Sequence, residues 1–215
     1  MRKITYIVLH HSATEPRLNA NDNTGAELVK AICAYHKKKN ALDKNYTCDY
    51  HYLVGPTGEV FSGQPEELPG WHSTNYQMNT ESLGVCFLGN FEKVEMPIEQ
   101  FNTGVFLIKK LMEKYKLSLK NVIRHMDVVS DLTKKTNSTQ CPGKNFPYIH
   151  FLEALKYGEG FFDVGEDYPY IAEVKFLKQL GIIKGDGYGN LRPHEYITRE
   201  EAMLLVYRVI NALKH

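Results

Sequence analysis

Between residues 6 and 124, short apolar segments typical of strands alternate with segments in which apolar residues have helical spacing. This alternation restricts the fold more than any other feature of the chain. Tyr6 to His10 and residues 83–88 have the β-branched and aromatic character of strands. Between residues 98 and 116 apolar side chains recur every three or four positions, which indicates an amphipathic helix, and a similar pattern follows Thr24, a candidate N-cap. The turn residues 55–58 separate two further short runs and predict a hairpin. The expected fold class is therefore α/β, with a central mixed sheet flanked by helices.

Two histidines close the first strand. Because neighbouring side chains on a strand point to opposite faces, only one of His10 and His11 can join a given site. Val122 to Arg124 predicts another strand that delivers His125 at its end, and the polar segment that follows contains Cys141. Two imidazoles and a thiol are zinc ligands, and three protein ligands leave a fourth position for a water that the metal acidifies. The same spacing also fits a surface imidazole and a buried thiol, so the residues alone leave both interpretations open.

The charge balance excludes two classes of partner. Lys and Arg total 26 against 25 Asp and Glu, which argues against nucleic-acid binding and against a polybasic membrane anchor. No apolar run approaches the length that spans a membrane. The first residues reach the histidine pair without a small-residue cleavage site, so we expect a strand there and no signal peptide. The four cysteines, at positions 33, 48, 86 and 141, form no C-x-x-C pair and are expected to be reduced thiols.

The segment from Gly70 to Asn79 is polar and aromatic and contains the single Trp of the chain. It precedes the apolar run at 83–88, and loops at strand ends frequently carry binding residues. We expect this segment to form the wall of a groove, with Trp71, His72 and Asn79 as substrate-binding residues.

The pattern of the sequence changes near Leu155, where strand-like segments no longer alternate with helical ones. After the junction at residues 157–160 come a helical stripe at 171–180, a Gly-rich turn, and a second helix that Thr198 and Glu201 open as a capping box. Two domains are expected, residues 1–156 and 157–215, and the smaller one has too few residues to bury much surface alone.

Several separated motifs occur in one order between residues 4 and 155. They are Ile7-Val8-Leu9-His10-His11-Ser12-Ala13-Thr14, Asp49-Tyr50-His51-Tyr52, Gly70-Trp71-His72, Asn79 to Val85 with Gly89-Asn90-Phe91, and Arg124-His125 to Cys141-Pro142-Gly143. Together they resemble the zinc-dependent N-acetylmuramoyl-L-alanine amidases of the type shared by phage lysozyme-like amidases and peptidoglycan recognition proteins.

The resemblance implies a role for each matching position. His10, His125 and Cys141 fall on the zinc ligands of the family. Tyr50 falls on its tyrosine, which would orient the attacking water or donate to the developing oxyanion, and Thr139 would add a neutral hydrogen bond there. The 16 positions from residue 125 to residue 141 exceed the usual family spacing, and Ser130 to Asn137 reads as an inserted loop. Some members of the family lack the cysteine and only bind peptidoglycan, so its presence here favours catalysis.

The second part of the chain, residues 160–213, is similar to a single S-layer homology repeat. The similarity is carried by residues 161–164, 180–187, 191–193 and 197–201. This family anchors proteins to a secondary polysaccharide of Gram-positive cell walls, usually with three repeats, so a lone repeat is expected to form a homo-oligomer (trimerise) or to bind weakly. Asp163 and Arg199 are the expected wall-binding residues, although Arg199 can equally form an ion pair at a helix start.

Two functions follow from these expectations. The first is an endolysin-like, zinc-dependent peptidoglycan hydrolase that cleaves the amide bond between N-acetylmuramic acid and L-alanine. It is expected to wait in the cytoplasm and to act on the wall after release. The alternative is a non-catalytic protein that recognises peptidoglycan with the same groove.

Overall fold

The computed structural model describes the following residues, except for the side chain of Tyr157: 2–14, 25–40, 44–132, 134–136, 139–157, 161, 163–165, 167–186 and 189–213. They form two compact units, Met1–Tyr148 and Ile149–His215, which are described separately below. The domain boundary expected after residue 156 stays a prediction.

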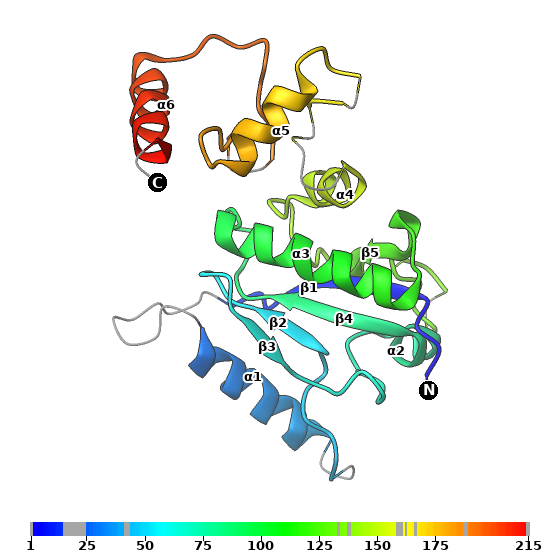
Figure 1. Cartoon of the computed structure of the whole chain (residues 1–215). Helices are drawn as coiled ribbons and strands as arrows, with labels where there is room; N and C mark the ends of the chain where they lie inside the picture. Colours follow the sequence, from blue (N-terminus) through cyan, green and yellow to red (C-terminus); the bar gives the residue numbers. More distant parts are fainter. Residues whose placement is uncertain are drawn as a thin grey trace. The chain divides into compact units, whose positions relative to one another are not determined.

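A five-stranded sheet forms the centre of the first unit (Figure 1). Its strands are β1 (Tyr6–His11), β2 (Tyr52–Val54), β3 (Val60–Ser62), β4 (Ser82–Phe87) and β5 (Val122–Arg124), in the order β3-β2-β4-β1-β5. β1 lies between β4 and β5 and runs parallel to both, while β3 pairs antiparallel with β2 through the hairpin expected at residues 55–58. The mixed sheet and the α/β fold class are confirmed.

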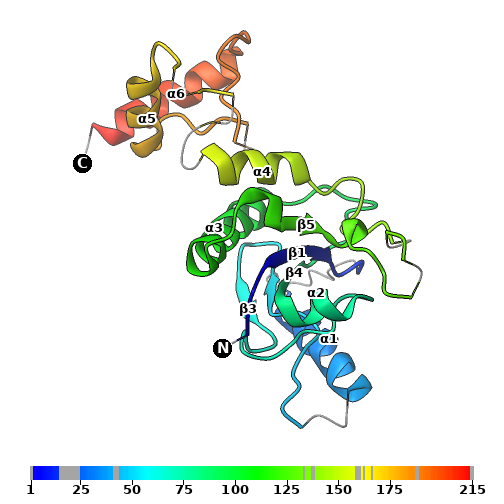
Figure 2. The same ribbon diagram turned by 90° about the vertical axis from the view of Figure 1, so that its right-hand side faces the viewer.

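Helices cover both faces of the sheet. α1 (Ala26–Lys39) and α3 (Ile98–Tyr115) lie on opposite sides of it (Figures 1 and 2). On the α1 side, Val29 packs with Leu53 of β2 and Cys86 of β4 in one buried cluster. α1 begins after Gly25, and the N-cap predicted at Thr24 falls outside the described residues.

A short helix was not expected where the sequence suggested a loop. α2 (Tyr76–Glu81) begins at Asn75, whose side chain accepts a hydrogen bond from the backbone N–H of Met78 at 2.8 Å. The helix feeds directly into β4, so it fixes the position at which that strand starts.

The second unit is helical. It contains α4 (Tyr148–Tyr157) apart from its first residue, α5 (Ile171–Gln179) and α6 (Arg199–Ala212). Phe161, Val164 and Val174 form its buried cluster. The capping box predicted at the start of α6 is present, with Thr198 accepting from the N–H of Glu201 and the Glu201 carboxylate accepting from the N–H of Thr198. Among the described residues, no helix has the length and apolar character needed to cross a membrane.

Candidate functional site

The carboxyl ends of two neighbouring parallel strands bring the predicted ligands together. His10 lies near the end of the central strand β1, and His125 follows β5 directly and opens a 3₁₀ turn, His125–Asp127. The carboxylate of Asp127 closes this turn by accepting from the backbone N–H of Arg124 at 3.2 Å, and it pairs with the Arg124 guanidinium at 2.9 Å. Asp127 is thus a loop cap, and it holds the turn that presents His125. Crevices at the carboxyl ends of parallel strands are the usual place for ligand sites in such sheets.

Cys141 completes the cluster from a distant loop. One ligand atom each from His10, His125 and Cys141 lies within 4.8 Å of the other two. The Cys141 Sγ atom is 3.8 Å from Nδ1 of His10, and the two imidazole centroids are 4.5 Å apart. Zinc bonds of 2.0–2.3 Å arranged as a tetrahedron separate ligand atoms by roughly 3.3–3.7 Å. The three side chains therefore match zinc in chemical type and nearly match it in spacing.

A chain of hydrogen bonds determines which nitrogen of His10 faces the sulfur. The hydroxyl of Ser82 donates its only proton to the carbonyl of Met78, so Ser82 Oγ can only accept from Nε2 of His72, 3.3 Å away. His72 in its neutral form then carries no proton on Nδ1, which accepts from Nε2–H of His10 at 3.1 Å. His10 is left with a lone pair on Nδ1, the atom beside Cys141. Such partners fix the tautomer and the orientation of metal-binding histidines.

Glycine at position 84 makes room for this chain of hydrogen bonds. A Cβ atom at Gly84 would lie 2.6 Å from Cδ2 of His72, so any side chain there would displace the His72 ring. His72 is itself buried, with 6% of its surface exposed. It contacts His10 on the side away from Cys141, so little of its surface is accessible to a substrate. The substrate contact expected for His72 stays a prediction.

Burial keeps the imidazoles neutral and the thiol protonated in the metal-free site. Burial, with the neighbouring histidines, lowers the pKa of His10 well below its usual value, and burial lowers the pKa of His125 to about 4. Burial raises the pKa of Cys141 to about 12, while the backbone N–H of His11, 3.4 Å from the sulfur, opposes that effect. Neutral imidazoles are the form that binds metals, and a divalent cation deprotonates a coordinated thiol. The donor set therefore fits a zinc ion.

His11 points away from the cluster, as the strand pattern predicts for one of the two neighbours. Its Nδ1 accepts from the backbone N–H of Phe91 at 3.2 Å, and its ring stacks on the Phe91 ring at a centroid distance of 6.1 Å. His11 contributes its backbone rather than its imidazole to the site.

The two residues expected to assist catalysis both lie beside the cluster. The Tyr50 ring centroid is 5.1 Å from that of His10, and burial raises the Tyr50 pKa well above its usual value, so the phenol keeps its proton. The Thr139 hydroxyl accepts from the backbone N–H of Cys141 at 3.1 Å and so orients the cysteine; accepting that bond leaves its own proton available.

The predicted groove wall is ordered by its own contacts. Trp71 keeps 40% of its surface exposed and contacts the ring of Tyr76 at a centroid distance of 6.0 Å. Asn79 is buried, and its amide bonds both backbone polar groups of Ser73, so it shapes the wall from behind. Asp131, in the segment predicted as an insertion, accepts from the backbone N–H of Tyr76 at 2.6 Å. The supporting roles of Ser82, Tyr76 and Asp131 could not be predicted, because nothing in their local sequence pattern marks them.

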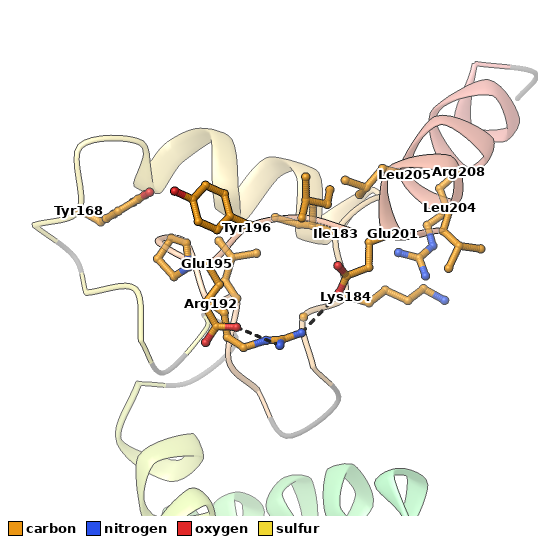
Figure 3. A pocket seen from close by; sticks show the side chains of 14 residues that line it. Tyr168, Ile183, Lys184, Arg192, Glu195, Tyr196, Glu201, Leu204, Leu205 and Arg208 are labelled. Carbon is orange, nitrogen blue, oxygen red and sulfur yellow. Dashed lines mark hydrogen bonds and ion pairs between the residues drawn. The ribbon is translucent and has the colours of Figure 1, made fainter. Parts of the chain in front are cut away.

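In the second unit the two expected wall-binding residues have different settings. The Asp163 carboxylate accepts from the backbone N–H groups of Leu191 at 2.7 Å and Arg192 at 2.5 Å, so it clamps the connection between α5 and α6. Arg199 is the first residue of α6. A cavity of about 480 Å³ lies in this unit, and Figure 3 shows Tyr168, Tyr196 and Leu204 on its walls. Arg192 also lines it and pairs with Glu195 and Glu201, at 3.1 and 3.5 Å.

Comparison with known proteins gives related matches for both units. Residues 1–144 match the family described as N-acetylmuramoyl-L-alanine amidase, and residues 160–203 match the S-layer homology domain. A peptidoglycan-recognition protein of Drosophila melanogaster is 28% identical over 158 residues, which are 73% of this chain and 75% of the relative.

Two solved structures have a similar fold. The amidase LysC from Clostridium intestinale superposes with a TM-score of 0.56 at 24% identity, over 72% of this chain and 87% of that one. The Drosophila peptidoglycan recognition protein SA gives 0.53 at 26% identity, over 68% and 76%. The amidase family match extends over two thirds of the chain, and the chain therefore belongs to the N-acetylmuramoyl-L-alanine amidase family and carries an S-layer homology domain after it in the sequence.

Proposed function

We propose that the chain is a zinc-dependent amidase that hydrolyses the bond between N-acetylmuramic acid and the L-alanine of the peptidoglycan stem peptide. The observation that carries this proposal is the convergence of His10, His125 and Cys141, whose ligand atoms all lie within 4.8 Å of one another. These three residues would hold the ion. Zinc bound there would supply a Lewis acid that polarises the scissile carbonyl and acidifies a water molecule.

The protein's own groups divide the remaining work. The hydrogen bonds from Ser82 through His72 keep the proton of His10 on Nε2 and its lone pair on the side facing Cys141. Tyr50 keeps its proton at neutral pH and donates a hydrogen bond to the oxygen that gains charge when the amide is attacked. Thr139 supplies a second, neutral donor and orients Cys141 through the backbone.

The substrate is expected to lie along the segment that starts at Trp71. Its exposed ring, together with that of Tyr76, offers an apolar surface against which a sugar face or a peptide side chain can pack. The following residue, His72, contacts His10 from behind, so this surface adjoins the cluster.

The S-layer homology domain associates the chain with the cell wall. We propose that it binds a secondary wall polysaccharide and keeps the amidase near its substrate, with Arg199 as the contact to test. An endolysin-like role, in which the protein reaches the wall after release from the cytoplasm, fits this arrangement of a hydrolase and a wall-binding module.

Digestion of purified peptidoglycan with the zinc-loaded protein tests the hydrolase. Mass spectrometry of the products should show stem peptides with a free L-alanine amino group and glycan strands that have lost them. Cys141→Ser should abolish this release, whereas Lys38→Gln, at an exposed position on α1, should leave it unchanged. No release by the zinc-loaded wild type would refute the proposal.

A second function has its own support, because several curated relatives are named peptidoglycan recognition proteins. In this alternative the groove binds peptidoglycan without hydrolysis. Metal analysis separates the two, since wall binding by protein that takes up no zinc favours recognition alone. Cys141, which completes the ligand set, supports the amidase.

A further inference from the structure

Cys33 and Cys48 lie in direct contact on the α1 side of the sheet. Their Sγ atoms are 2.6 Å apart, well inside the roughly 3.5–4.0 Å at which uncharged heavy atoms normally rest. Cys33 is half-buried on α1, and Cys48 is fully buried two residues before Tyr50. Bond formation, at about 2.05 Å, needs an approach of only about half an ångström.

The backbone around the two thiols is already held in place. Asp49 receives the amide of Asn40 at 3.3 Å, the Nε2 of His36 at 3.3 Å and the hydroxyl of Tyr46. The backbone N–H of Asp49 donates to Nδ1 of His36 at 3.2 Å. These contacts join the C-terminal end of α1 to the segment that leads to Tyr50, so the two sulfur atoms have little freedom to separate.

We propose that Cys33 and Cys48 form a redox-active pair that closes to an intramolecular disulfide, which staples α1 to the segment carrying Tyr50. This proposal is independent of the hydrolytic function. The oxidant is a low-molecular-weight disulfide such as oxidised glutathione.

The exchange proceeds in two balanced steps. The Cys33 thiolate attacks one sulfur of the small disulfide, which gives a mixed disulfide on Cys33 and releases one small thiolate. Cys48 then attacks the Cys33 sulfur, and its proton passes to the departing small thiolate. The second small thiolate leaves, so two protein thiols have been oxidised and one small disulfide has been reduced to two thiols.

Exposure and charge determine the order of attack. Cys33 is the more accessible of the two, and its hydrogen bond with Cys48 lowers the Cys33 pKa. The same contact, together with burial, raises the pKa of Cys48, which therefore reacts second and inside the protein. Association with the cell wall places the chain outside the reducing cytosol. Disulfides persist in that extracellular environment. The expectation of four reduced thiols would then hold only for Cys86 and Cys141.

Oxidation of the full-length, zinc-loaded protein with oxidised glutathione tests the pair. After alkylation and proteolysis without reductant, mass spectrometry should find a Cys33–Cys48 linked peptide, and the intact mass should fall by about two hydrogens. The thermal midpoint of the oxidised protein should exceed that of the reduced protein by about 6–12 °C, because a bond that closes a loop of about 15 residues lowers the entropy of the unfolded chain.

Matched variants make the result decisive. Cys33→Ser should lose both the linked peptide and the gain in thermal midpoint. Cys86→Ala changes a buried cysteine of the same cluster and should keep both. The proposal is overturned if all four thiols of the wild type still react with alkylating agent. A stable glutathione adduct on Cys33, or a link between any other pair, overturns it equally.

Discussion

At the scale of single residues, one proton decides how the proposed metal site works. The rings of His10 and His72 and the hydroxyl of Ser82 allow only one consistent placement of hydrogens, and it ends with an unprotonated Nδ1 on His10. Spacing in the sequence identified the ligand, but which of its nitrogens binds depends on Ser82 and His72, 72 and 62 positions away along the chain.

Replacing His72 by Phe should weaken zinc binding. The ring volume is kept, but Nε2–H of His10 loses its acceptor, so the wrong tautomer becomes accessible and zinc affinity should fall by about 10- to 100-fold. Competition with a chromophoric chelator measures this change without any assay of activity. His72→Asn keeps an acceptor near the Nδ1 position and should recover part of the loss. Equal affinity for zinc in His72→Phe and wild type would show that the hydrogen bond does not position His10.

Acid should destabilise the fold through His51. Burial, with the Arg2 guanidinium, lowers the pKa of this imidazole from 6.5 to about 4, and its Nδ1 accepts from the backbone N–H of Gly84 at 3.0 Å. Between about pH 6.5 and pH 4 the unfolded chain binds a proton at His51 that the folded chain does not. The free energy of unfolding therefore falls as the pH falls through this window, by about 1 kcal/mol from pH 7.5 to 5.5 for this residue.

Urea unfolding of the metal-free protein at these two pH values measures the effect. His51→Asn retains an acceptor for Gly84 but cannot titrate, so it should lose less stability between pH 7.5 and 5.5 than the wild type. His150→Gln, a control at a partly exposed histidine 3.3 Å from the Glu153 carboxylate, should behave as the wild type. An identical pH dependence in His51→Asn and wild type would contradict the assignment.

At the scale of elements, a buried amide joins α3 to the sheet. Gln100 is fully buried, and its Nε2 donates to the backbone carbonyl of Val54 at 2.8 Å and to that of Leu88 at 3.0 Å. Both carbonyls lie at the carboxyl ends of strands, close to the edge at which the candidate ligands gather. The side chain of Gln100 on α3 therefore holds the ends of β2 and β4 in a fixed position relative to each other.

Gln100→Leu should lower the free energy of unfolding by about 1–3 kcal/mol. Leucine has a similar volume, but the Leu88 carbonyl loses the amide that donates to it, and the Val54 carbonyl keeps only the backbone N–H of Leu88 at 2.9 Å. The midpoint of urea unfolding measures the loss, and Glu99→Gln, in the same turn, should leave it unchanged. A Gln100→Leu protein as stable as the wild type would mean that the amide does not join the two layers.

Elements with strong periodicity were predictable, and those fixed by distant partners were not. The helical spacing of apolar residues in α3 and the strand character of β1 follow from the residues of those elements alone. The six-residue helix α2 has too few turns to show a period, and its start depends on the Asn75 cap and on Asp131 from a remote segment. The strand order places β5 beside β1 although 110 residues separate their ends, which no local pattern encodes. The three ligands could be named from family motifs, but the chain of hydrogen bonds behind them could not.

At the scale of the whole molecule, the proposed hydrolysis and the proposed wall attachment belong to different units. The candidate ligands and their supporting residues all lie within residues 1–148, whereas the match to the S-layer homology domain lies within residues 149–215. α6 carries an exposed apolar face that includes Met203, Val206 and Tyr207, which lie three and four positions apart and are each at least 59% exposed. An apolar surface of this kind suits contact with another molecule rather than with solvent.

Substitutions in one unit should therefore impair either hydrolysis or sedimentation with cell walls, but not both. Cys141→Ser removes a zinc ligand, so it should abolish the release of stem peptides and still sediment with purified cell walls. Asp163→Asn weakens the clamp on the backbone of Leu191 and Arg192, so it should lower sedimentation with walls while leaving the hydrolysis of soluble muropeptides intact. Arg199→Gln removes the charge at the start of α6 without touching that clamp, and it should reduce sedimentation only if the guanidinium contacts the polysaccharide. If the two units depended on each other, Asp163→Asn would instead lose as much hydrolysis of soluble muropeptides as sedimentation. That result would contradict the prediction, because a change confined to the second unit would then affect the candidate metal ligands of the first.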